Sequence, residues 1–200
     1  MQLDGAEKIL EFWFGADDAP NDVRDQLAAR WFVRDDGFDG EIRARFSNLI
    51  DAAISGELDS WTRSPRSWLA LLLLLDQFPR NIYRESSLAF CGDYKAQRTA
   101  VAGISRGDDR ELPIRYRVFA YLPLEHAEDL LLQRRSVALI EALAEDPDAK
   151  PAAVYAQYLD YAKRHCEVIA RFGRFPHRND VLGRISTPGE HAYLNAGGGF

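Results

Sequence analysis

Cysteine is scarce in this sequence, and neither of its two copies belongs to a recognisable pattern. Cys91 and Cys166 are the only cysteines among 200 residues, and they lie far apart in unrelated contexts. That arrangement excludes a disulfide framework of the kind found in small secreted proteins, and it lacks the spacing of a zinc site. The thiols are therefore expected to be reduced, as in a cytosolic protein.

Long apolar runs are also missing. The longest run, residues 68–75, is well short of the roughly 20 apolar residues that a membrane-spanning helix needs. The first ten residues lack a basic segment followed by an apolar stretch, so no signal peptide is predicted. We therefore expect a cytoplasmic protein with no membrane association.

Positive charge is in deficit, with a formal net charge of −6. Generic nucleic-acid binding needs a basic face that releases counterions from phosphates, so we expect no nucleic-acid partner. The basic residues are almost all arginine, since lysine occurs only at positions 8, 95, 150 and 163. Arginine abundance alone has no functional meaning, and only the placement of particular arginines can support a functional argument.

The familiar signatures of catalysis are absent as well. The chain has no phosphate-cradling glycine loop, no dinucleotide fingerprint and no nucleophile elbow. The spacing around His126 matches neither the zinc motif His-Glu-x-x-His nor the Glu-x-x-His pairs of di-iron bundles. We therefore predict no cofactor and no metal, and find no support for covalent catalysis.

Helical periodicity recurs from end to end, without any sustained alternating pattern of a strand. The segment 66–77 is apolar nearly all round, which predicts a helix at the centre of the fold. Short predicted loops favour antiparallel neighbours. We predict an all-α fold: residues 1–196 form a single domain of stacked antiparallel helices without a significant sheet, and residues 197–200 form a flexible tail. The predicted helices cover residues 4–14, a short segment after Asn21 that buries Leu27, Trp31 and Phe32, 39–55, 66–77, 93–106, 113–121, 124–144, 152–172 and a last helix after Thr187.

A short motif occurs twice, as DQFPRN at residues 76–81 and as RFPHRN at 174–179. Proline disfavours helical geometry in the residue before it, so the chain is expected to turn at Phe78 and at Phe175. Two interpretations of the following arginines and asparagines remain open. They either satisfy carbonyl groups at helix ends or converge to hold an anion. The residues concerned are Arg80, Asn81, Arg178 and Asn179.

Histidines and acids accompany these motifs. His165 falls on the apolar stripe of its predicted helix, where it is either a hydrogen-bonded core residue or a group for proton transfer. Pro123 is expected to restart a helix and so to place Glu125 and Glu128 in its first turn. His126 between them could bind a metal or act as a base, although the spacing matches neither the zinc motif nor the di-iron motif.

Three strings resemble a mostly bacterial family catalogued as domain of unknown function nine-two-four. They are DQFPRNIYR at residues 76–84, YLPLEHAE at 121–128 and FGRFPHRNDVLGRIST at 172–187. The resemblance extends over nearly the whole chain, although Ala127 stands where the family pattern has serine. It implies a tetratricopeptide-like helical fold and no established activity.

The leading hypothesis is a site for a small anionic ligand, at which acid–base catalysis would be the chemistry. The candidate catalytic residues are His165, His126, Glu125 and Asp76, and the candidate ligand-binding residues are Arg80, Asn81, Arg84, Arg174, His177, Arg178, Asn179 and Arg184. The alternative hypothesis is a helical module that binds a peptide or a protein partner. A third interpretation is that these groups only stabilise the fold.

Overall fold

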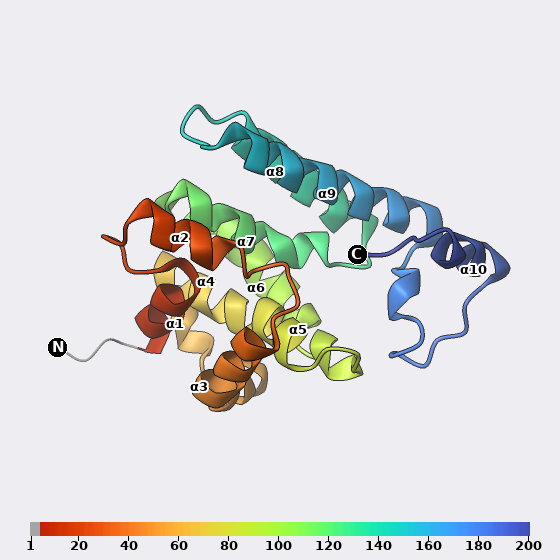
Figure 1. The fold of residues 1–200 in the computed structure, drawn as a ribbon, viewed down its shortest axis with the longest axis horizontal. Helices are drawn as coiled ribbons and strands as arrows, with labels where there is room; N and C mark the ends of the chain where they lie inside the picture. The colour runs from red at the N-terminus through yellow and green to blue at the C-terminus, as the bar shows by residue number, and fades with distance from the viewer. Residues whose placement is uncertain (1–4) are drawn as a thin grey trace.

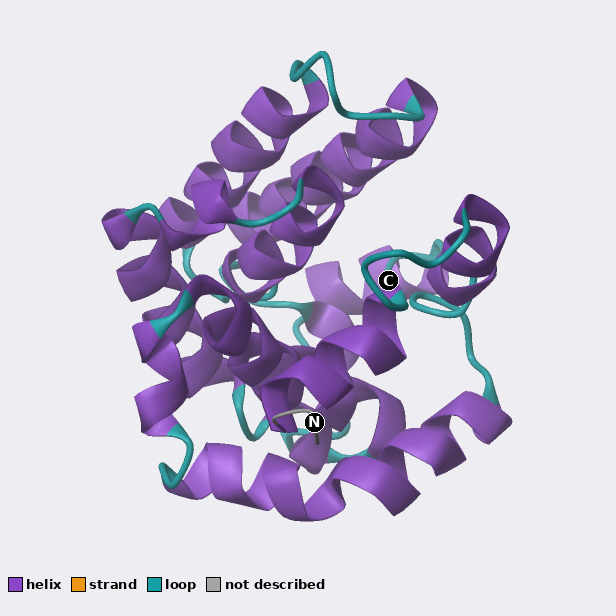
Figure 2. Cartoon of the chain, turned by 90° about the vertical axis from the view of Figure 1, so that its left-hand side faces the viewer, coloured by secondary structure: helices purple, strands orange, loops and turns teal. Residues whose placement is uncertain are grey.

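The structure is a computed structural model that describes residues 5–200, and within that range it contains helices and no strand (Figures 1 and 2). The predicted all-α fold is confirmed, while the predicted helix start at Asp4 lies outside the described residues. The helices are α1 (Gly5–Phe14), α2 (Asn21–Ala28), α3 (Asp36–Ser55), α4 (Pro65–Leu72), α5 (Phe78–Ile82), α6 (Asp93–Arg106), α7 (Ile114–Glu125), α8 (Leu130–Ala144), α9 (Ala152–Phe172) and α10 (Pro188–Asn195).

Helix α4 is the centre of the molecule, as its apolar sequence predicts. Ser64 caps its amino end by accepting a hydrogen bond from the backbone of Ser67, and Pro65 occupies the first turn. Residues 68–75 are all buried, because α1, α6 and α7 pack around this helix. The Trp68 indole donates to the carbonyl oxygen of Thr99 on α6 at 2.9 Å, which satisfies the one polar atom of a fully buried ring.

Helices α8 and α9 form an antiparallel hairpin along α7, at the top of Figure 1. Asp129 caps α8 by accepting from the backbone of Leu131 and Leu132. The chain after α9 then folds back, through a loop and α10, toward the carboxyl end of α7. Thr187 and Glu190 form a capping box at the start of α10, the last helix predicted from the sequence. This return brings the second copy of the repeated motif toward the first.

Two boundaries predicted from proline are wrong. Pro123 lies inside α7, which continues to Glu125, so Glu125 and His126 end a helix instead of starting one. Phe78 keeps helical angles (φ −62°, ψ −40°), and the chain does not turn there. The turn Leu73–Gln77 is π-helical instead, with the Phe78 N–H donating to Leu73 O. This wider turn accommodates Pro79, and burial of both segments outweighs the roughly 3 kcal/mol that an internal proline costs.

The second proline turn has the predicted form. Helix α9 ends at Gly173, which has a positive φ of 70°, and Phe175 before Pro176 is extended (φ −89°, ψ 107°). The same motif therefore continues a helix in its first copy and turns the chain in its second.

The burial predicted after Asn21 is wrong in part. Helix α2 has no buried residue; Leu27 and Trp31 are half-buried, and Phe32 is 57% exposed. Because α2 ends at Ala28, the two aromatic residues lie in the following turn and do not share the helix face. The Trp31 indole still donates to the Trp13 carbonyl oxygen at 2.9 Å.

The described helices include none that is both long enough and apolar enough to cross a membrane. The tetratricopeptide-like character, the domain limits and the flexibility of residues 197–200 stay predictions. In the structure, the ring of Phe200 lies on that of His165, with 3.5 Å between the ring centroids.

Candidate functional site

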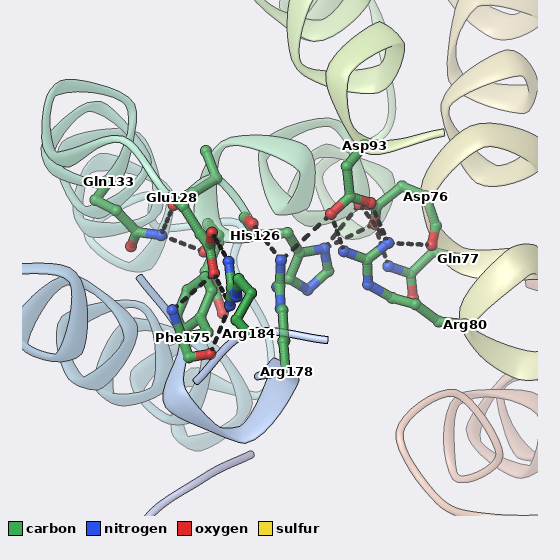
Figure 3. A network of polar contacts seen from close by, with 12 residues as sticks. Asp76, Gln77, Arg80, Asp93, His126, Glu128, Gln133, Phe175, Arg178 and Arg184 are labelled. Atoms are coloured by element: carbon green, nitrogen blue, oxygen red, sulfur yellow. Dashed lines mark hydrogen bonds and ion pairs between the residues drawn. The ribbon is translucent and has the colours of Figure 1, made fainter. Parts of the chain in front are cut away.

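Both copies of the repeated motif reach one carboxylate, Asp93, in the first turn of α6 (Figure 3). Arg80 makes a bidentate pair with it, at 2.8 and 3.0 Å. Arg178 approaches the same carboxylate at 3.3 Å, from a position 85 residues further along the chain. Both guanidinium groups also lie over the ring of Phe90, at 5.5 Å for Arg80 and 4.6 Å for Arg178. The two arginines thus meet at a carboxylate of the chain itself, and each also donates to a backbone carbonyl oxygen, Arg80 to that of Asp76 and Arg178 to that of His126.

Asp93 itself was not predicted from the sequence. An acid in the first turn of a helix is normally explained by the helix dipole alone. Its position depends on Gly92, where a β-carbon would lie only 2.1 Å from the backbone oxygen of Leu75. Glycine therefore lets the start of α6 approach the turn Leu73–Gln77, which follows α4, closely enough to place Asp93 beside Arg80. A glycine before a first-turn acid is the only sequence signal, and it is weak.

Asp76 and His126 form the centre of the cluster. Asp76 is 1% exposed, and its two carboxylate oxygens lie 2.8 and 3.0 Å from Nδ1 of His126. Gln77 Nε2 donates to the same carboxylate at 2.6 Å, and Arg80 lies 3.2 Å from it. Although burial opposes ionisation, Arg80 and His126 hold the pKa of Asp76 well below its usual range. The acid therefore stays charged at neutral pH.

Unlike the Asp76 carboxylate, the His126 ring is uncharged at neutral pH. Burial first, and the charge of Arg80 second, lower the pKa of His126 below its usual value. The neutral ring places its proton on Nδ1, since that atom faces a carboxylate that can only accept. Nε2 then carries a lone pair, and among residues 5–200 it has no hydrogen-bond partner. This arrangement is that of a general base oriented by an acid.

A second histidine and a second buried acid lie beside the first pair, in a different charge state. His165 Nδ1 lies 2.8 Å from the carbonyl oxygen of Tyr161 and 3.2 Å from Oε1 of Glu125. Burial, and then the charge of Asp76, raise the pKa of Glu125 to about 8, while burial lowers the pKa of His165 to about 3. At neutral pH this contact therefore joins a protonated carboxyl to a neutral ring and is no ion pair. The two histidine rings lie 6.2 Å apart.

Arg178 is the least satisfied member of the cluster. It is 6% exposed, and Nη1 donates to the carbonyl oxygen of His126 at 3.1 Å. Its Nε is buried without any partner among the described residues, and so is Nδ1 of the neighbouring His177. Burial, together with the charge of Arg80, lowers the pKa of Arg178 to about 10. Burial and the charge of Arg178 likewise lower the pKa of His177 to about 4.

Other predicted ligand-binding residues of the second copy brace its loop. Arg184 makes a bidentate pair with Glu128 at 2.6 and 2.9 Å, and it also donates to the side chain of Asn179. Glu128 further accepts from the backbone of Phe175 at 2.8 Å. Arg174 pairs with Glu190 at 2.6 Å, outside the cluster. These contacts fix the loop that holds Arg178.

Asn81 and Arg84 point elsewhere. Asn81 donates to Asp39 of α3 at 2.8 Å, and Arg84 pairs with the same carboxylate at 2.6 Å. They join α5 to α3 and lie apart from the histidines, so the structure does not bring them into the cluster. Within residues 5–200 there is no group of three or more His, Cys, Asp or Glu side chains that could hold a metal ion.

The fold and the cluster define an all-α protein in which two arginines, two histidines and three acids from five distant segments share one buried region. The chain belongs to the family described as bacterial protein of unknown function (DUF924), whose model matches residues 9–198. The solved structure of protein of unknown function ATU0120 from Agrobacterium tumefaciens is similar, with 38% sequence identity and a TM-score of 0.81. That match covers 96% of this chain and 97% of the other. None of the curated proteins compared matches this chain. The predicted family membership is thus confirmed.

Proposed function

We propose that the cluster around Asp76 and His126 is a small-molecule site that performs acid–base chemistry on an anionic ligand. The observation that supports this proposal is the pairing of His126 with a buried, charged carboxylate, which leaves Nε2 as an unpaired base. A histidine held in this way by an acid is a common arrangement for proton abstraction.

The neighbouring groups have complementary roles in this proposal. Arg178, which is buried with an unpartnered Nε, binds the negative group of the ligand. Glu125 carries a proton at neutral pH because its pKa is raised to about 8, and it supplies the acid. Two acids beside each other, one charged and one protonated, provide opposite proton-transfer roles in the same site. His165 orients the protonated acid through its Nδ1.

The first test is a thermal-shift series with three anions that carry no aromatic ring, inorganic phosphate, succinate and methyl phosphate. A ligand present at 100 times its dissociation constant stabilises the folded state by about 2.7 kcal/mol, which corresponds to roughly 5–10 °C for a chain of this size. We expect at least one of these anions to raise the melting temperature of the wild type, and Arg178→Gln to remove the shift. Arg134→Gln on the exposed face of α8 deletes the same charge and should leave the shift intact.

The second test addresses His126. Asp76→Asn removes the charge that favours the imidazolium, so the pKa of His126 should fall further, as followed by NMR of the ring Cε1 proton. Asp148→Asn, in the exposed loop between α8 and α9, is the matched control. An unchanged His126 titration in Asp76→Asn, or the absence of a thermal shift with all three anions, would contradict the proposal. A stoichiometric protein partner without anion binding would favour the interaction module instead.

A further inference from the structure

A cavity of about 600 Å³ lies on the opposite part of the molecule, between α2, the start of α7 and the start of α9. These segments lie toward the left of Figure 1, away from α10 and the cluster around His126. The volume falls within the range of about 300–1,000 Å³ that is typical of small-molecule sites. None of the candidate residues from the sequence lies in its lining, which contains Phe14, Asn21, Arg24, Asp25, Ala28, Trp31, Pro113, Ile114, Arg115, Lys150, Pro151, Val154, Tyr155 and Tyr158.

The charge of this lining is unusual for an acidic chain. Three cations, Arg24, Arg115 and Lys150, line the cavity against a single acid, Asp25. Within residues 5–200, none of the three cations makes an ion pair. The Nε atoms of Arg24 and Arg115 are moreover buried without a hydrogen-bond partner in that range. The cavity therefore has an unmatched surplus of positive charge.

The backbone adds to this surplus. Helices α2, α7 and α9 all begin at the cavity, with Pro20, Pro113 and Pro151 as their N-cap residues. Proline has no side-chain acceptor, so none of the three amino ends is closed by a side-chain hydrogen bond. Helices α7 and α9 also carry no acid in their first turns. The amino ends of α7 and α9, with no acid in their first turns, therefore lie at the same cavity as the cations, and the amino end of α2 lies there with Asp22 in its first turn.

The lining also contains aromatic residues. Phe14 and Trp31 lie edge to face, with ring centroids 5.6 Å apart, and Tyr155 and Tyr158 from α9 meet in the same way at 5.9 Å. Burial raises the pKa of Tyr158 to about 12 and that of Tyr155 above its usual value. Both phenols therefore remain protonated, and neither hydroxyl has a hydrogen-bond partner among the described residues. They can donate to an anion while their rings contact an apolar body.

We propose that this cavity binds a small organic anion that carries an aromatic ring. The carboxylate or phosphate of the ligand lies against Arg24, Arg115 and Lys150, and the ring packs among Trp31, Tyr155 and Tyr158. This site is separate from the cluster around His126, and it does not depend on the function proposed for that cluster.

The test is isothermal titration calorimetry of the full chain with four probes. Phenylacetate and phenyl phosphate carry both ring and charge, benzyl alcohol carries the ring alone, and inorganic phosphate the charge alone. We expect saturable binding of one or both aromatic anions, at least tenfold tighter than that of benzyl alcohol or inorganic phosphate. Preference for phenylacetate or for phenyl phosphate then tells a carboxylate ligand from a phosphate ligand.

Variants locate the binding. Arg115→Gln and Lys150→Gln should each weaken the binding of the aromatic anion by about tenfold or more, because each removes one charged donor. Val154→Trp, which fills the mouth without changing charge, should abolish it. Arg134→Gln, on the exposed face of α8 outside the cavity, should have no effect on this binding. Lys150 is exposed, so Lys150→Gln carries the test even if Arg115→Gln fails to fold.

The proposal is overturned if neither aromatic anion binds saturably up to about 10 mM, or if benzyl alcohol binds equally tightly. It is also overturned if binding survives both Lys150→Gln and Val154→Trp. Loss of binding in Arg178→Gln alone would assign the signal to the cluster around His126 and would equally contradict this site.

Discussion

The charge states around His126 follow from how burial and neighbours act on each residue separately. Asp76 and Glu125 are both buried acids, yet only Asp76 has an arginine and a histidine within reach. Glu125 has a neutral ring and the negative charge of Asp76 nearby, so its pKa rises where that of Asp76 falls. The pKa values of the two acids therefore differ because Arg80 lies in contact with Asp76 and not with Glu125.

Glu125 gives the protein a pH-dependent stability with a defined sign. Its pKa is about 8 in the folded state against 4.5 in the unfolded chain, so the folded state retains a proton that the unfolded state releases. The free energy of unfolding contributed by this group is fully present below pH 4.5 and is lost as pH rises through about 8, by up to about 5 kcal/mol. Glu125→Gln has nearly the shape of the protonated acid and cannot ionise, so it should remove the loss of unfolding free energy at high pH.

Urea denaturation at pH 5, 7 and 9 measures this effect as the difference between the wild type and Glu125→Gln. The variant should be close to the wild type at pH 5 and more stable at pH 9. Glu11→Gln, at an exposed position of α1, should show no such pH-dependent difference. Parallel curves for the wild type and Glu125→Gln at all three pH values would show that Glu125 ionises normally.

At the scale of the elements, the close packing of α6 against α4 determines the position of Asp93 in the cluster. Gly103 of α6 sits against the ring of Trp68, and a β-carbon there would lie 2.2 Å from the ring carbon Cε2. Together with Gly92 at the start of the same helix, it lets α6 lie directly against α4. Asp93 reaches Arg80 only because α6 approaches this closely.

A pair of glycine substitutions tests this packing. Alanine normally stabilises a helix by about 1 kcal/mol relative to glycine, and Gly40→Ala on α3 should do so, since a β-carbon there meets nothing within 4 Å. Gly103→Ala should instead lower the free energy of unfolding by about 1–3 kcal/mol, because the fully buried Trp68 cannot move aside. Chemical denaturation of both variants gives the comparison. Equal stabilisation in both would mean that α4 and α6 are further apart.

At the scale of the whole molecule, the last segment of the chain returns to the cluster. The ring of Phe200 stacks on His165 and also lies 5.9 Å from the ring of His177. Burial is the main reason for the low pKa of both histidines. The end of the described chain thus covers one side of the residues that we propose for acid–base chemistry.

Phe200→Ala should therefore raise the pKa of His165 from about 3 toward 6.5, because the ring that excludes water from it is removed. NMR titration of the Cε1 proton of His165 measures this shift. Ile185→Ala is the control, since Ile185 is 91% exposed. A His165 titration that is unchanged in Phe200→Ala would indicate that residues 197–200 are detached in solution, as the flexible tail predicted from the sequence requires.

Features that depend on a few neighbouring residues were predictable. The caps at Ser64 and Thr187, the glycine end of α9 and the extended Phe175 all follow from local backbone preferences. The same local rule failed at Phe78 and at Pro123. Both lie in buried stretches of helix, residues 68–79 and 118–125, where packing outweighs the preference of the residue before proline.

The sequence by itself determined the helical class, the family and the residue types that could do chemistry. Periodicity, caps and the three family strings are all contained in short stretches of chain. Only the tertiary structure decided which of those residues meet. It brought Arg80, His126 and Arg178 together, left Arg84 and Arg174 in other ion pairs, and added Asp93. It also assembled the cavity at α2, α7 and α9 from segments with no common motif. The reason is that contacts between residues 50 or 85 positions apart depend on how helices pack, and no local pattern encodes that distance.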